Sequence, residues 1–136
     1  TINPLELRDK EEQSIELATQ QLVGVFQELI PDALLSNQMR ALLSPCLSTL
    51  LRARMSSLED LQVFLRSGKN DRRLKQGLNS PIQSHRRFFS EDFHDPIYKN
   101  TKASIIVKVQ SLLNSKVFYN LVTGTSTINL DRLIRQ

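Results

Sequence analysis

Apolar side chains that recur at steps of three and four residues constrain this chain most strongly, because such spacing places them on one face of an α-helix. We expect Asp9 to cap the first helix, with Glu11 and Glu12 in the first turn, where the helix dipole favours acids. Pro31 should end this helix, since proline has no backbone N–H to donate. The predicted apolar face comprises Ile15, Leu17, Ala18, Leu22, Val25, Phe26 and Leu29.

Proline, glycine and capping residues predict further helices along the rest of the chain. An apolar run over residues 34–54 contains Pro45, which predicts either a kink or two abutting helices. The capping-box spacing of residues 56–59 begins the next helix, and Gly68 ends it. The remaining expected elements are a helix at 71–76 between Asn70 and Gly77, a helix from Ser80-Pro81 to residue 89, a loop at 90–96, helices at 101–113 and 115–122, and an extended piece at 128–130. The sequence therefore predicts an all-α fold, a compact bundle of about six to seven helices around one core.

The length of 136 residues suits a single domain that spans residues 1–136. A chain of this size buries roughly two-thirds of its unfolded surface, so it needs no metal or disulfide to hold it together. The lone Cys46 lies in an apolar run and is expected in the core of a protein from a reducing compartment. No apolar stretch approaches the ~20 residues that span a bilayer. The chain begins without methionine, which we interpret as the mark of an excised fragment.

No arrangement of side chains indicates catalysis or metal binding. His85 and His94 lie near Asp92 and Asp95, but their spacing matches no zinc pattern, so we expect both histidines to pack or hydrogen-bond at the surface. Residues 123–127 are rich in hydroxyls but lack the lysine of a phosphate-binding loop. No nucleophile is paired with a base. We therefore expect no enzyme activity, no metal and no cofactor in this domain.

Charge is distributed unevenly along the chain. Residues 1–33 carry seven acidic and two basic side chains, a net charge of −5, whereas residues 66–87 carry seven basic and one acidic, a net charge of +6. Phosphate contact requires several cations on one face, so the basic segment is the candidate site for nucleic acid or an acidic protein partner, and an ordinary solvated face is the alternative. Phe88, Phe89 and Phe93 are expected in the core rather than stacked on bases. The candidate binding residues are Arg66, Lys69, Arg72, Arg73, Lys75, Arg86 and Arg87.

Four segments, in order along the chain, together form a further pattern. They are Ile2-Asn3-Pro4-Leu5; His85-Arg86-Arg87-Phe88-Phe89 with Asp92-Phe93; Tyr98 and Thr101-Lys102 leading into Ser104-Ile105-Ile106-Val107-Lys108 and Leu112-Leu113; and Thr127-Ile128-Asn129-Leu130-Asp131-Arg132-Leu133-Ile134. This pattern resembles the all-alpha domain of hexameric ATPases of the type IV secretion coupling protein class, relatives of the HerA and FtsK motors. The stretch Phe-Phe-Ser-Glu-Asp-Phe departs from the Phe-Trp…Glu-Phe form that is common in that family.

The resemblance implies an inserted domain of a larger P-loop ATPase. The chain would leave the motor domain at Asn3-Pro4 and return through residues 128–134, so that residues 1–8 and 127–136 form the connections. The Walker A lysine and the Walker B acids, together with ATP and Mg²⁺, would belong to the parent protein. That parent would be a homo-hexamer on the cytoplasmic side of a bacterial inner-membrane complex, and the isolated domain would be a monomer.

The function that the resemblance implies is substrate recognition. In that family the helical domains lie at the cytoplasmic mouth of the hexamer's channel. There the domain would contact DNA, a relaxase–DNA complex, or a secreted effector or adaptor protein. Two alternatives stay open: protein–protein docking without nucleic-acid contact, and support of neighbouring subunits in the ring.

Overall fold

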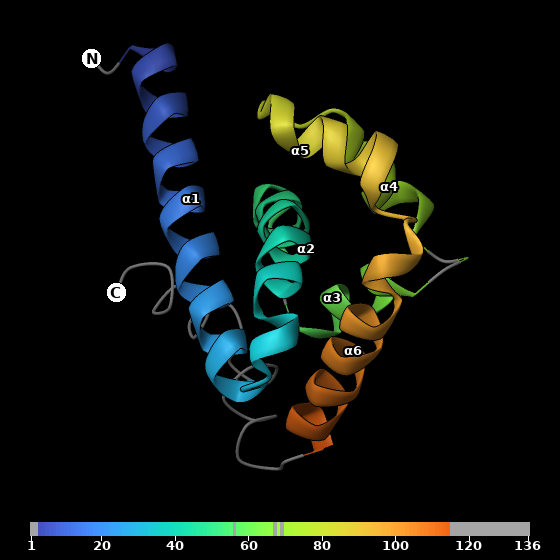
Figure 1. Cartoon of the computed structure of the whole chain (residues 1–136). Coiled ribbons are helices and arrows are strands. Elements are labelled where there is room, and N and C mark those ends of the chain that lie inside the picture. Colours follow the sequence, from blue (N-terminus) through green and yellow to red (C-terminus); the bar gives the residue numbers. More distant parts are fainter. Residues whose placement is uncertain (1–2, 56, 67, 69, 115–136) are drawn as a thin grey trace.

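The computed structural model describes residues 3–55, 57–66, 68 and 70–114, and within these ranges the chain is all-helical, without a β-strand (Figure 1). The predicted all-α class is therefore confirmed for these residues. The helix expected at 115–122, the extended piece at 128–130 and the return segment at 127–136 lie outside the described residues. The elements are α1 (Pro4–Leu29), α2 (Ala33–Arg52), α3 (Glu59–Leu65), α4 (Asp71–Leu78), α5 (Gln83–Arg87), a π-helical turn η1 (Phe88–Asp92), a 3₁₀ turn η2 (Pro96–Tyr98) and α6 (Lys99–Asn114).

The first helix begins earlier than the capping pattern at Asp9 predicted. The side chain of Asn3 accepts a hydrogen bond from the backbone N–H of Leu5 at 3.0 Å, and Pro4 occupies the first turn. Asparagine before proline makes a strong helix start, because the amide satisfies a free N–H and the proline ring presets φ. The helix ends at Leu29, before Pro31 as predicted, so α1 is 26 residues long.

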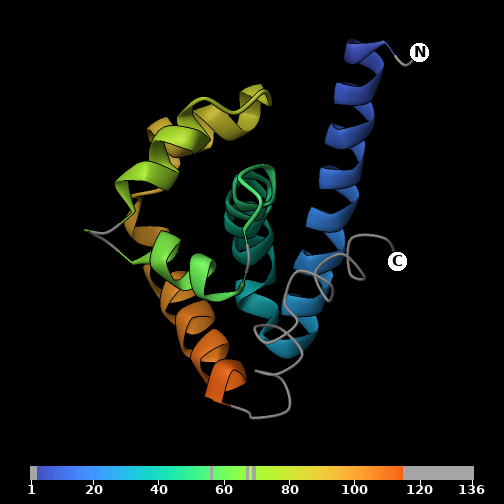
Figure 2. The same cartoon turned by 180° about the vertical axis from the view of Figure 1, so that it is seen from behind.

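The N-terminal part of α1 extends beyond the rest of the bundle (Figures 1 and 2). No residue from Asn3 to Leu17 is fully buried, and burial begins at Ala18. The predicted apolar face is only partly correct, since Leu17 and Val25 are 52% and 39% exposed. The buried face of α1 consists of Ala18, Thr19, Leu22, Val23 and Phe26.

Helix α2 is the centre of the bundle and packs against α1, α3, α4 and α6 (Figure 1). It runs through Pro45 as a single helix, so the alternative of two abutting helices is wrong. The hydroxyl of Thr49 donates to the Pro45 carbonyl at 2.8 Å. Cys46 is fully buried as predicted, and burial raises the pKa of its thiol. No helix among the described residues is long and apolar enough to cross a membrane.

An aromatic cluster fills the space between α3, α4, η1 and η2. The ring of Phe64 stacks on Phe89 and meets the edge of Phe93, each at 5.6 Å between centroids, and Phe88 and Tyr98 extend the cluster. The expectation that Phe88, Phe89 and Phe93 are core residues is confirmed.

The loop predicted for residues 90–96 is in part a helical turn. After α5 the backbone continues as the π-helical turn η1, closed by the N–H of Phe93 donating to the Phe88 carbonyl at 2.8 Å. A hydrogen bond between residues five apart brings those two residues over one another, so Phe88 and Phe93 both face the core. An α-helical turn would bring together residues three and four apart instead.

The starts and ends of the short helices differ from the predicted ones by a few residues. The side chain of Asn70 does not cap α4 but donates to the Phe64 carbonyl at 2.8 Å. Helix α4 continues to Leu78, so Gly77 lies inside it rather than after it. Helix α5 begins at Gln83, because the hydroxyl of Ser80 accepts from the N–H of Ile82 in a turn that precedes the helix.

Candidate functional site

Six of the seven predicted basic residues lie within the part of the chain that the structure describes. Lys69 lies outside the described residues. Arg66 follows α3 and lines a groove of about 310 Å³ between α3 and α6. The other five, Arg72, Arg73, Lys75, Arg86 and Arg87, are on α4 and α5, which pack against each other. None of these five residues lines the groove beside Arg66.

Helix α4 presents two exposed cations that have no partner among the described residues. Leu74 packs on the core, whereas Arg72 and Lys75 are exposed and have no hydrogen-bond or ion-pair partner among the described residues. Residues three apart are neighbours on a helix, so these two charges lie side by side. Arg73 is half-buried and donates to the side-chain oxygen of Gln76 at 3.0 Å.

The two arginines of α5 are held by neighbouring groups. The guanidinium of Arg86 donates to the Ser80 carbonyl at 2.7 Å. Arg87 forms an exposed ion pair with Glu91 at 3.0 Å, which offsets its charge. Of the five cations on α4 and α5, Arg72 and Lys75 are therefore the two most available to a ligand.

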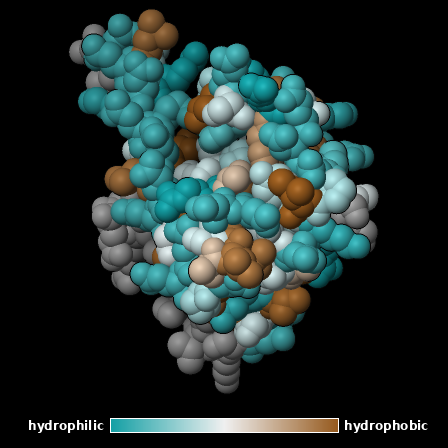
Figure 3. Space-filling model, viewed as in Figure 1, coloured by the Kyte–Doolittle hydropathy of each residue, from teal (hydrophilic) through white to brown (hydrophobic). Residues whose placement is uncertain are grey.

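A second feature, which the sequence did not indicate, is a cleft of about 710 Å³ between α1, the C-terminal half of α2 and the beginning of α5. We call it the α1–α5 cleft. The space beside the projecting part of α1 is visible as a hollow in Figure 3. The lining residues are Asp9, Glu12, Gln13, Ile15, Glu16, Thr19, Gln20, Ser44, Ser48, Arg52, Pro81, Ile82, Ser84 and His85.

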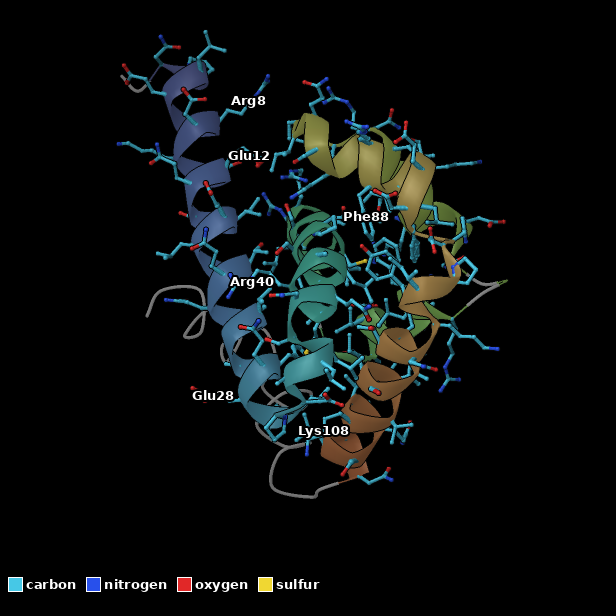
Figure 4. The ribbon with its side chains drawn as sticks, in the orientation of Figure 1. Arg8, Glu12, Glu28, Arg40, Phe88 and Lys108 are labelled. Atoms are coloured by element: carbon cyan, nitrogen blue, oxygen red, sulfur yellow. The ribbon has the colours of Figure 1, made fainter. Side chains whose placement is uncertain are left out.

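A bidentate ion pair joins α1 to α2 within this cleft. Arg52 donates from Nε and Nη2 to the two carboxylate oxygens of Glu12, at 2.7 and 2.8 Å, and Nη2 also reaches the Ser48 hydroxyl at 3.1 Å. Figure 4 shows the Glu12 side chain extending from α1 on the side that faces α5. The hydrogen bonds from Arg52 lower the pKa of the Glu12 carboxyl, and burial opposes this effect only in part.

His85 lies at the other side of the cleft with an unsatisfied ring nitrogen. The side chain is half-buried, and Nδ1 is buried without a hydrogen-bond partner among the described residues. Burial lowers the pKa of the imidazole, and the positive charge of Arg52 lowers it further, against the opposing carboxylates of Glu12 and Glu16. The ring is therefore neutral at pH 7. The expectation of a surface histidine that packs or hydrogen-bonds is only partly correct for His85.

The Glu12–Arg52 pair gives a prediction for stability. We expect Glu12→Gln to lower the free energy of unfolding by about 1–2 kcal/mol at pH 7, because Arg52 loses a charged acceptor. The carboxyl has a lower pKa folded than unfolded, so its stabilisation is complete above the unfolded value of about 4.3 and is lost as the pH falls through the folded value. The difference between wild type and variant should therefore shrink as the pH is lowered from 5 to 3.

Urea denaturation at pH 7, 5 and 3 measures this effect. The matched control is Glu28→Gln, also on α1, since Glu28 is exposed and has no partner among the described residues. The control should stay within about 0.5 kcal/mol of wild type at pH 7. An equal loss in both variants would show that helix charge, rather than the ion pair, stabilises the fold.

Comparison with known proteins found no match: no family model matches the chain, and neither a curated protein nor a solved structure is significantly similar to it. The resemblance to coupling ATPases therefore stays a hypothesis that rests on the sequence motifs.

Proposed function

We propose that this chain is the substrate-recognition domain of a hexameric ATPase of the type IV secretion coupling class, and that the α4–α5 surface contacts the phosphate backbone of DNA. The sequence motifs that resemble this class support the proposal, as does the all-helical fold. In the intact protein the domain would be inserted in the motor, on the cytoplasmic side of the membrane complex. ATP and Mg²⁺ would be bound by the parent's motor domain.

The observation that carries the proposal is the pair of unpartnered cations on α4. Arg72 and Lys75 are exposed next to each other, and α5 packs beside them with two further arginines. Cations gathered in this way bind phosphates and release condensed counterions, which makes affinity depend steeply on salt. Such contacts position a domain on DNA without reading its sequence. The expected activity is weak docking of a nucleoprotein substrate, independent of base sequence.

DNA titration tests this function. Fluorescence anisotropy with labelled single- and double-stranded DNA at about 50 and 200 mM salt should show affinity that falls as salt rises. For Arg72→Ala/Lys75→Ala we expect roughly tenfold weaker binding at low salt. The slope of log affinity against log salt concentration should also be smaller in magnitude by about two, one for each lost phosphate contact. The charge-matched control is Arg40→Ala/Lys108→Ala, on α2 and α6, whose positions are labelled in Figure 4. An absence of binding at low salt, or an equal loss in the control, would contradict the proposed surface.

Docking of a partner protein is the second candidate function, and the α1–α5 cleft favours it. The cleft is lined by the acidic side of α1, and its lining includes neither Arg72 nor Lys75. A domain that only supports neighbouring subunits would bind neither DNA nor a peptide, and its charge variants would alter only ring assembly.

A further inference from the structure

We propose that the α1–α5 cleft binds a basic segment of a partner polypeptide, whose arginine or lysine side chain lies against the carboxylates of α1. The lining of this cleft includes none of the α4 cations, and the proposal does not depend on DNA contact. Its volume of about 710 Å³ lies within the range typical of ligand sites. Its walls come from three helices, so it is a concave site rather than a flat charged surface.

The charge of the cleft selects a cationic ligand. Asp9, Glu12 and Glu16 follow one another at steps of three and four residues, so they share one side of α1. The single cation among the lining residues, Arg52, is already engaged by Glu12. Asp9 and Glu16 are exposed and have no hydrogen-bond or ion-pair partner among the described residues. Two carboxylates are thus left for a ligand's positive charge.

The remaining walls fit a peptide better than a free cation. Ile15 and Ile82 provide apolar surface on which the aliphatic stem of a lysine or arginine packs while its charged end reaches a carboxylate. Gln13, Gln20 and Ser84 line the cleft with polar groups that can hydrogen-bond to the backbone of an extended segment. An arginine fits particularly well, because its planar fork binds a carboxylate through two hydrogen bonds.

His85 contributes its half-buried, uncharged ring to the lining of this site. Its buried Nδ1 has no partner among the described residues, although buried polar atoms are normally hydrogen-bonded. Nucleic acid is disfavoured in the same place, since its phosphates would meet the carboxylates of Asp9 and Glu16.

Peptide titration tests the site. The probe is a short fluorescein-labelled peptide of alternating arginine and serine, and the comparison peptide has glutamate in place of each arginine. We expect the arginine peptide to bind the wild-type chain and the glutamate peptide not to bind.

For Asp9→Lys/Glu16→Lys we expect about tenfold weaker binding or more of the arginine peptide, because attraction becomes repulsion. The matched control, Glu11→Lys/Glu28→Lys, changes the same charge on the same helix outside the cleft and should lose about threefold or less. Equal losses in the two variants would overturn the proposal.

Nitrogen-15 NMR of the wild-type chain locates the bound peptide. The signals of the His85 ring and of the amides lining the cleft should shift on titration, and shifts confined to α4 or α6 would overturn the site. Sedimentation of the chain alone provides a further check. A dimer that the cleft variant abolishes would make a second copy the occupant and would contradict a separate partner.

The DNA titration keeps the two proposals distinguishable. Asp9→Lys/Glu16→Lys should bind DNA at least as well as the wild-type chain, since it adds positive charge and leaves α4 intact. Arg72→Ala/Lys75→Ala should in turn retain its affinity for the arginine peptide. Circular dichroism verifies that each variant keeps its helix content. Loss of peptide binding in the α4 variant would show that the two sites are not independent and would overturn the assignment to the cleft.

Discussion

Phe64→Ala should lower the free energy of unfolding by about 3–5 kcal/mol, the largest effect we expect from a single substitution. Phe64 is fully buried on α3, and its ring contacts Phe89 and Phe93 at 5.6 Å between centroids. Truncation removes this apolar surface from the core and leaves a cavity, because neighbouring rings from different elements relax only in part. Since domains of this kind are stable by about 5–15 kcal/mol, the variant should be close to unfolding at 37 °C.

Chemical denaturation followed by circular dichroism measures this loss, and the neighbouring residue provides the control. Val63 is 45% exposed on the same short helix, so Val63→Ala should change stability by about 0.5 kcal/mol or less. A loss below about 1 kcal/mol for Phe64→Ala would mean that the aromatic cluster does not hold α3 to η1.

Gly77→Ala should destabilise the fold by about 1–3 kcal/mol, although alanine is the better helix former by about 1 kcal/mol. A Cβ atom at position 77 would lie 2.5 Å from Cδ2 and Cε2 of Phe89, far inside van der Waals contact. Phe89 is itself buried against Phe64, so its ring has little room to retreat. The glycine is required by the close approach of α4 to the aromatic cluster.

The same substitution at Gly24 should act in the opposite direction. Gly24 lies within α1, and nothing is within 4 Å of the Cβ position there. Gly24→Ala should therefore stabilise the chain by about 0.5–1 kcal/mol through helix propensity alone. Thermal or urea denaturation of both variants measures the contrast. Stabilisation by both substitutions would show that the α4–η1 packing tolerates a methyl group.

Helix propensity and periodicity predicted the elements well where the signal was local. The apolar period and Pro31 located most of α1, and the same reasoning placed Cys46 and the three phenylalanines of residues 88–93 in the core. The first and last residues of each helix were less predictable, because several neighbouring residues can cap the same helix end. Asn3 with Pro4 began α1 instead of Asp9, and Asn70 used its amide on the Phe64 carbonyl instead of capping α4.

The candidate site was less predictable than the fold. Clustering in sequence correctly indicated basic residues on neighbouring helices, but it did not show that Arg86 and Arg87 are held by Ser80 and Glu91. It also did not locate the α1–α5 cleft. Glu12 and Arg52 are 40 residues apart, and sequence alone predicts only a helix-dipole role for Glu12. The spacing of Asp9, Glu12 and Glu16 on one helix side was the available signal.

The amino-acid sequence by itself determined that this chain is helical and which side chains are apolar enough to form its core, because both follow from backbone geometry over a few neighbouring residues. Only the tertiary structure decided which charges stay free. Arg72 and Lys75 remain available on α4, whereas Arg52 neutralises Glu12, and α1 projects to form one wall of a cleft. Such outcomes depend on how helices distant in sequence pack, since a charge is free or paired according to what the fold brings within hydrogen-bonding distance.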